Sequence, residues 1–184
     1  MNNSISLIKR LISHFSGLRK KQFSLILFFM IITAFAEVFS LGAIFPFLAV
    51  LTDPEIIKNN TFFNYFIDFT IFEDDLEMIL FFTLLFILTA VLSGILRVFL
   101  LVFSIRTSFA AGADISNKIF YKTLHQPYKI HISRNSSEVI NGVFNKTSMI
   151  IHGVLMPLFL FLSAIAMIFF VLSAMFYFLS LIHI

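Results

Sequence analysis

The stretch Arg106–Gly153, RTSFAAGADISNKIFYKTLHQPYKIHISRNSSEVINGVFNKTSMIIHG, is polar, mostly basic and set between two long apolar runs. Upstream of Pro127 the helical pattern is interrupted only by the isolated Gly94 and Gly112, each tolerated in a helix at a cost of about 1 kcal/mol. We therefore predict one helix over Asp75–Leu124. At ~1.5 Å per residue it would be roughly 75 Å long, against a hydrocarbon core of ~30 Å. About half of this helix must stand outside the membrane.

The second arm of this hairpin has its own helix start. Asn135 is a good N-cap residue, and Glu138 follows three residues later, which is the capping-box spacing. The extramembrane arms, residues 106–124 and 136–153, would each reach about 27 Å beyond the bilayer. Between them lies a tip, residues 125–135. Two arms of this length are costly unless a partner docks on the tip, so the shape itself favours a docking function.

The composition is that of a membrane protein with several spans. The chain is 59% hydrophobic and 12% charged, and its mean hydropathy is +0.99. These values lie outside the range of soluble domains. The chain contains no cysteine, which excludes a disulfide framework and any thiolate metal site.

Three apolar runs predict transmembrane helices at about residues 23–51, 76–105 and 154–178. Pro46 is expected to kink the outer end of the first span. The predicted fold class is an all-α membrane protein with an N-terminal amphipathic helix and three transmembrane helices. Two of these helices extend into the long cytoplasmic hairpin, residues 106–153.

Residues 1–22 precede the first span and predict an amphipathic helix on the inner leaflet, with basic residues toward anionic headgroups. Its apolar positions follow the spacing of one helix face and are Ile8, Leu11, Ile12, Phe15 and Leu18. The alternative is that this segment is only the basic flank of the first span.

The distribution of charge predicts the orientation. Residues 1–22 hold five bases and no acid, and the stretch 106–146 holds six bases and two acids. The loop 52–77 holds seven acids and one base. The positive-inside rule therefore places the N-terminus and the hairpin in the cytoplasm, in a multi-pass protein of the cell inner (plasma) membrane. Within the loop, the apolar run Phe62–Ile67 predicts a short interfacial helix.

The tip carries a recognisable phrase, Leu124-His125-Gln126-Pro127-Tyr128, followed by Asn135–Ile140. Together with the long arms, it resembles the first intracellular loop of ABC exporters. The resemblance implies the N-terminal half of a type-1 ABC transmembrane domain over residues 23–178, with residues 1–22 as its elbow helix. It also implies that the tip is a coupling helix seated in a groove of a nucleotide-binding domain. The expected coupling residues are Pro127, Tyr128, Lys129, Ile130 and His131.

The same resemblance implies partners and a substrate class. The nucleotide-binding domain would be supplied in cis or in trans, and it would bind the ATP and Mg²⁺ and hydrolyse the ATP. A homo- or heterodimer of half-transporters in contact with membrane lipids is expected, with no nucleic acid. The phrase Glu37–Leu48, EVFSLGAIFPFL, resembles the first span of exporters that move lipid-linked saccharides and other glycoconjugates. A lipid or lipid-linked saccharide is thus the preferred substrate, and peptides and drugs stay open.

Two charged residues lie inside apolar runs, Glu37 and Arg97. An ionisable group in lipid is costly, so both should face protein or a water-filled cavity. One interpretation is that they line a translocation path. The other is that they form an ion pair, or that Arg97 snorkels toward the interface.

No catalytic chemistry is expected from these residues. The sequence has no G-x-x-x-x-G-K-[ST] phosphate-binding loop and no set of nucleophile, base and acid in a plausible site. His125 and His131 are six residues apart, which is not the spacing of helical metal ligands. We expect no catalytic, cofactor-binding or metal-binding residue in this chain, and no enzymatic activity without a separate ATPase domain.

The last six residues, Leu179–Ile184, match the translation of a transposase end sequence used in preparing sequencing libraries. We therefore expect a gene fragment with an artificial tail over 179–184, the alternative being a genuine short protein. The alternative function is that of a small membrane-anchored interaction protein that recruits a cytosolic partner through the hairpin.

Overall fold

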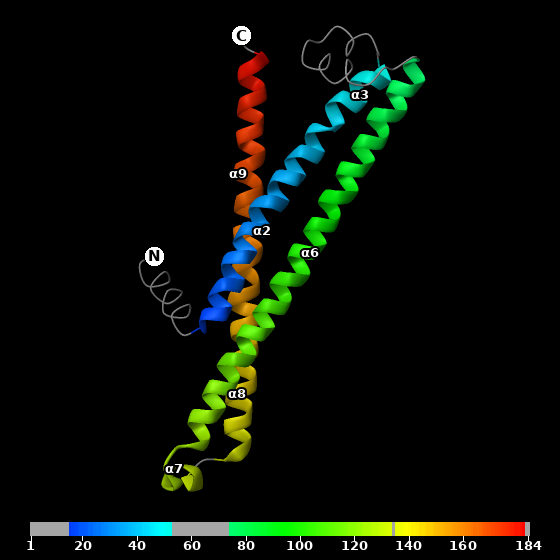
Figure 1. Ribbon diagram of the computed structural model, residues 1–184. Coiled ribbons are helices and arrows are strands. Elements are labelled where there is room, and N and C mark those ends of the chain that lie inside the picture. The colour runs from blue at the N-terminus through cyan, green and yellow to red at the C-terminus, as the bar shows by residue number, and fades with distance from the viewer. Residues whose placement is uncertain (1–14, 53–73, 134, 183–184) are drawn as a thin grey trace. The chain divides into compact units, whose positions relative to one another are not determined.

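The computed structural model describes residues 15–52, 74–133 and 135–182, and all its regular elements there are helical (Figure 1). In chain order they are α2 (Gly17–Gly42), α3 (Ile44–Thr52), α6 (Asp75–Leu124), α7 (Tyr128–Ser133), α8 (Ser136–Ile150), the π-helix η1 (Ile151–Leu155) and α9 (Met156–Ile182). Three stretches are long and apolar enough to cross a membrane, Gly17–Thr52, Asp75–Leu124 and Ser137–Phe176. The predicted all-α membrane fold with three spans is confirmed.

The chain divides into two compact units. The first, called here the hairpin unit, comprises Met1–Met30 and Leu100–Ala164. The second, called the span unit, comprises Ile31–Phe99 and Ile165–Ile184.

Helix α6 confirms the predicted long arm. It is a single α-helix of 50 residues, Asp75–Leu124, and it continues past Arg106 without a break. It stops before Pro127 because proline has no amide hydrogen to donate and disfavours the helical conformation at the residue before it.

Helix α2 begins within residues 1–22, the segment that the sequence assigned to a surface helix. Phe15 and Ser16 are not helical, and α2 begins at Gly17, so residues 17–22 belong to the first long helix. The Ser16 hydroxyl oxygen accepts a hydrogen bond from the backbone N–H of Arg19 at 3.4 Å, and this N-cap starts the helix there. Residues 1–14 and the predicted interfacial helix Phe62–Ile67 lie outside the described residues.

The helix is interrupted at Ala43, between α2 and α3, close to Pro46, where a kink was predicted. The backbone N–H of Ala43 still bonds to Phe39 O at 3.0 Å, and that of Phe47 bonds to Ala43 O at 3.4 Å. Pro46 has no N–H to offer the carbonyl of Gly42, which is where α2 ends.

The π-helix η1 falls where the second arm was expected to give way to the third span. The N–H of Met156 bonds to the carbonyl of Ile151, five residues back. Pro157 follows at once, and its ring would crowd the carbonyl of Gly153 in a regular α-helix. A wider turn before Pro157 accommodates that ring, so the predicted boundary at Val154 lies inside η1.

Each unit has its own apolar core. In the hairpin unit, one cluster is Ile26, Met30, Leu100 and Phe159, and another is Phe15, Ala111 and Leu155. The ring of Phe23 touches both, with centroids 5.1 Å from Phe15 and 5.3 Å from Phe159. In the span unit the core is Val50, Met78 and Phe82.

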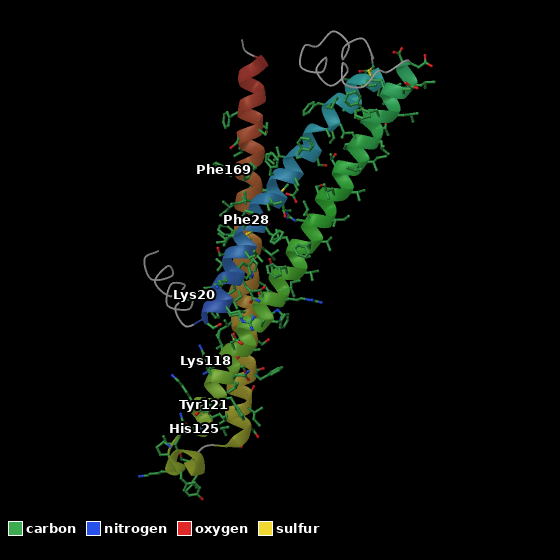
Figure 2. All side chains as sticks on the ribbon, viewed as in Figure 1. Lys20, Phe28, Lys118, Tyr121, His125 and Phe169 are labelled. Atoms are coloured by element: carbon green, nitrogen blue, oxygen red, sulfur yellow. The ribbon has the colours of Figure 1, made fainter. Side chains whose placement is uncertain are left out.

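Large apolar side chains also cover the outside of the long helices. Phe28 on α2 and Phe169 on α9 are both exposed (Figure 2). Exposed aromatic rings on helices of this hydropathy fit contact with lipid tails.

Candidate functional site

The hairpin tip is built by three helix-ending and helix-starting signals. At the end of α6, the N–H of Gln126 bonds to Thr123 O at 3.2 Å. The carbonyl of Pro127 then accepts the N–H of Ile130 at 2.8 Å, which opens α7. Finally, the Asn135 side chain accepts the N–H of Ser137 at 3.1 Å and caps α8, as predicted. The tip is therefore a separate short helix held between two longer ones.

Helix α7 presents apolar side chains outside the predicted spans. Tyr128 is 78% exposed and Ile132 is 68% exposed, and their spacing of four puts them on one face. Lys129 is exposed beside them, and Ile130 is just over one-third exposed. The backbone of His131 belongs to α7, and its side chain lies outside the described residues. Sequence reasoning missed Ile132, although its spacing from Tyr128 was a usable signal.

His125 and Tyr121 secure the last turn of α6 (Figure 2). The Nδ1 atom of His125 lies 2.8 Å from the carbonyl oxygen of Tyr121, and the two ring centroids are 4.0 Å apart. Among the described residues, no group of three or more His, Cys, Asp or Glu side chains could hold a metal ion. The contacts of His125 with Tyr121 stabilise the end of α6, which precedes α7 in the chain.

The arms of the hairpin meet at Gly112. A Cβ atom at this position would lie 2.3 Å from Cδ1 and 2.5 Å from Cγ1 of Ile151. Ser108 and Ala111 are fully buried on the same side of α6. Ser108 and Gly112 have the small-xxx-small spacing that lets helices approach closely. From the sequence, Gly112 was interpreted only as a glycine that a helix tolerates at some cost in stability. The structure shows that it is a point of close packing between the two arms.

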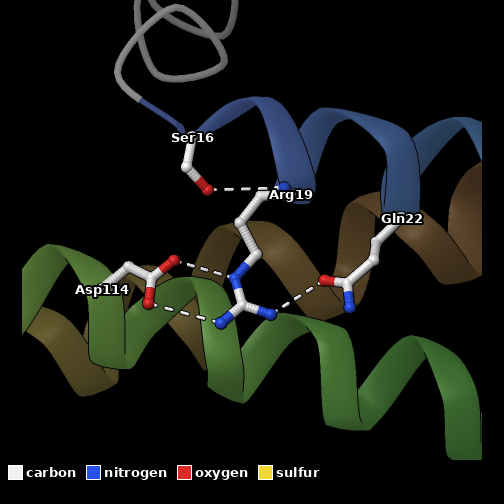
Figure 3. Close-up of polar contacts among 4 residues, drawn as sticks. All are labelled: Ser16, Arg19, Gln22 and Asp114. Carbon is white, nitrogen blue, oxygen red and sulfur yellow. Dashed lines mark hydrogen bonds and ion pairs between the residues drawn. The ribbon is translucent and has the colours of Figure 1, made fainter.

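An ion pair joins the start of α2 to the first arm (Figure 3). Arg19 donates from Nε to Oδ2 of Asp114 at 2.8 Å and from Nη2 to Oδ1 at 3.3 Å. Its Nη1 donates to Oε1 of Gln22 at 2.8 Å. Both charges lie outside the predicted spans 23–51 and 76–105. The hydrogen bond from the Arg19 guanidinium holds the pKa of the Asp114 carboxyl below its usual value, and the same bond raises the pKa of Arg19.

We expect the pair to add a modest amount of stability. Asp114→Asn and Arg19→Gln should each lower the free energy of unfolding by up to about 1 kcal/mol, because both side chains remain partly exposed. The double variant should cost less than the sum of the single variants, since each single change already removes the interaction. Thermal unfolding followed by circular dichroism in detergent gives the three values. Additive costs would show that the two side chains do not interact.

In the span unit, Glu37 on α2 and Arg97 on α6 form an ion pair. The Nη1 atom of Arg97 lies 2.9 Å from Oε1 of Glu37, and the side chains are 45% and 15% exposed respectively. The other carboxylate oxygen of Glu37, Oε2, is buried and has no hydrogen-bond partner among the described residues. Of the two interpretations from the sequence, the ion pair is confirmed, and a place on a translocation path stays a prediction.

A family comparison covers most of this architecture. The family model for the ABC transporter transmembrane region matches residues 43–181, which is 139 of the 184 residues. The chain belongs to the ABC transporter transmembrane family. No curated protein matches the chain.

The match places the site within a known kind of membrane domain. In this ABC transmembrane domain, the matched residues include α6, the tip helix α7, α8 and nearly all of α9. Arg97 lies inside the matched range, and Glu37 and Arg19 precede it. Transmembrane domains of this family work with a nucleotide-binding domain, so a partner of that kind is implied in general.

Proposed function

We propose that this chain supplies spans and one coupling hairpin to the permease domain of an ABC exporter. In this proposal α7 sits in a groove of the nucleotide-binding domain and passes the motion of ATP-driven closure to the spans. The observation that carries the proposal is the short helix α7, with Tyr128 and Ile132 exposed at the end of two helical arms. An exposed aromatic ring with an apolar neighbour and adjacent lysine is a typical anchor for a partner's pocket and its acidic rim.

The arms are suited to carry motion from the tip. Helix α6 runs unbroken from Asp75 to Leu124, so a displacement of its tip end moves a continuous element. The close contact of Gly112 with Ile151 holds the second arm against the first. The ion pair of Arg19 with Asp114 ties α2 to the same region. The motion of a domain that binds α7 can therefore be transmitted through the arms to the spans.

The substrate we propose is a lipid, a lipid-linked saccharide or another amphipathic molecule. The resemblance of Glu37–Leu48 to glycoconjugate exporters supports this choice. We also propose an N-terminus in the cytoplasm, a location in the cell inner membrane, and a homo- or heterodimer of half-transporters.

The test replaces the anchor of the tip. Tyr128→Ala, in the transporter that unites this chain with its ATPase domain, should raise the number of ATP molecules hydrolysed per substrate moved by about tenfold or more, since a lost anchor is worth ~2 kcal/mol or more. The ratio is measured in proteoliposomes from phosphate release and from transport of a fluorescent phospholipid. Membrane insertion should not change.

The matched control is Phe144→Ala. Phe144 is also an exposed aromatic residue, but it lies on the α8 arm beyond the tip. It should leave the ratio close to that of the unchanged protein. An unchanged ratio in Tyr128→Ala, accompanied by a lower protein yield, would mean that Tyr128 only stabilises the turn, and the coupling proposal would fail.

A further inference from the structure

The guanidinium of Arg97 has an unused binding edge. An arginine side chain carries five N–H donors in a rigid fork, and the Nε and Nη2 atoms present two parallel donors along one edge. Among the described residues, Arg97 makes one hydrogen bond, from Nη1 to Glu37. Its Nε/Nη2 edge therefore has no acceptor among the residues that the structure describes.

Arg19 shows how the same fork is filled within this protein. Its Nε and Nη2 atoms grip the two oxygens of Asp114, and its Nη1 bonds to Gln22 (Figure 3). Arg97 also uses Nη1 for a protein acceptor, Oε1 of Glu37. The difference is that a carboxylate occupies this edge in Arg19, whereas no described residue occupies it in Arg97.

The surroundings of Arg97 make an open edge costly unless a ligand fills it. The residues on either side of it, Leu92, Ile95, Val98 and Phe99 among them, are exposed apolar side chains of the predicted span. Unsatisfied donors in such a setting are strongly unfavourable because lipid tails offer no acceptor. Arg97 is nevertheless 45% exposed, so the edge is reachable from outside the protein.

Gly94 leaves room for that approach. It lies one turn before Arg97, and side chains three residues apart share a helix face. Apart from its two chain neighbours and the backbone of α6 itself, no described atom lies within 4 Å of the place where its Cβ would be. Helical side chains lean toward the N-terminus of their helix, so a residue larger than glycine here would crowd the space beside the guanidinium.

We propose that Arg97 binds the phosphate group of a phosphate-bearing membrane lipid through its Nε/Nη2 edge. Phosphate is the ligand class because its oxygens match the bidentate fork. A lipid is the source because the site lies among exposed apolar side chains of the predicted span. By helix rise, Arg97 is only about 13 Å from Arg106, where the polar arm begins. A lipid headgroup can approach Arg97 from that side by local adjustment of the bilayer. The inference deepens the proposed function, on which it rests for the lipid being a transported one.

The test measures lipid contact at Arg97 directly. The photoreactive residue p-benzoylphenylalanine replaces the exposed Val98 in the full 184-residue chain, which is placed in phosphatidylcholine nanodiscs. Tritiated phosphatidic acid or tritiated diacylglycerol with the same acyl chains is added. Phosphatidic acid should cross-link about tenfold more than diacylglycerol, because charge-assisted hydrogen bonds are strong in an apolar setting.

Matched variants distinguish phosphate binding by the guanidinium of Arg97 from a purely structural role of Arg97 in its ion pair with Glu37. Glu37→Gln should keep the preference, because the Nε/Nη2 edge is unchanged. The double variant Glu37→Gln/Arg97→Gln removes both charges without leaving one unpaired, and it should reduce phosphatidic acid to the level of diacylglycerol. Arg97→Lys should lose most of the preference since lysine has no fork. Gly94→Leu should lose it while the helix content stays the same.

Three results would overturn the inference. One is a full preference in the double variant. Another is a full preference in Arg97→Lys, which would mean that any positive charge at residue 97 attracts the anionic lipid without a bidentate fork. The last is loss of cross-linking on addition of inorganic phosphate, which would mean that the ligand of Arg97 is a soluble anion and not a lipid. A chain that binds phosphatidic acid in this way, in a transporter that does not move it, would contradict the proposed substrate and leave the lipid site standing.

Discussion

Gly112→Leu is expected to lower the free energy of unfolding of the hairpin by about 3 kcal/mol, at the upper end of the cost of overpacking. The reason is steric. A Cβ at residue 112 would already lie 2.3 Å and 2.5 Å from two side-chain carbons of Ile151, which is itself buried. A leucine side chain there would have to displace Ile151, and Thr147 Cγ2 lies 3.5 Å from the same point. Thermal unfolding in detergent, followed by circular dichroism, measures the loss.

Gly94→Leu is the matched control for this prediction. It introduces the same residue into the same helix α6, at a position where the added Cβ meets no described atom within 4 Å beyond its chain neighbours and the backbone of α6. Leucine is a better helix former than glycine, so the free energy of unfolding of Gly94→Leu should equal or slightly exceed that of the unchanged protein. A second change, Ile151→Ala, should recover part of the loss caused by Gly112→Leu. Equal effects at both glycines would contradict the close-packing explanation.

The second large effect is expected at the Glu37–Arg97 pair. Arg97→Leu should lower stability by about 3 kcal/mol, because it leaves the mostly buried carboxylate of Glu37 without its cation. One oxygen of that carboxylate, Oε2, already lacks a partner among the described residues, so the loss of Arg97 removes the one ion pair that Glu37 makes there.

The double variant Glu37→Leu/Arg97→Leu should return stability close to that of the unchanged protein. Replacing both partners of a buried ion pair by apolar residues is often neutral, whereas removing one partner is costly. The unfolding free energies of the two single variants and the double variant, measured in the same detergent, give the coupling. A double variant as unstable as Arg97→Leu would show that the cost has another source.

The parts of the fold that the sequence predicted are those with local causes. Helix α6 follows from an apolar pattern with no proline before Pro127, so both its ends could be placed. The cap at Asn135 depends on an N–H two residues away. The break between α2 and α3 follows from the missing donor of Pro46. Each of these signals acts within one or two turns of the chain.

The parts that it did not predict depend on the fold around them. The partner of Arg19 is 95 residues away, so spacing along the chain gave no signal for the bond to Asp114. The role of Gly112 depends on Ile151 lying against it. The π-helix η1 is one of several ways to accommodate a proline, so Pro157 alone did not predict it. The start of α2 at Gly17 was missed because the apolar pattern of residues 1–22 masked the Ser16 cap.

The most direct test of the coupling proposal is contact between the tip and the ATPase domain. The photoreactive residue p-benzoylphenylalanine is placed at Tyr128 in the assembled transporter, and at Phe144, an exposed position on the α8 arm, as the control. After illumination, mass spectrometry identifies the cross-linked peptides. We expect residue 128 to cross-link to the nucleotide-binding domain, and at least about tenfold more than residue 144, since hot-spot contacts are confined to the centre of an interface. Cross-links from residue 128 only to lipid or to the hairpin itself would contradict the proposal.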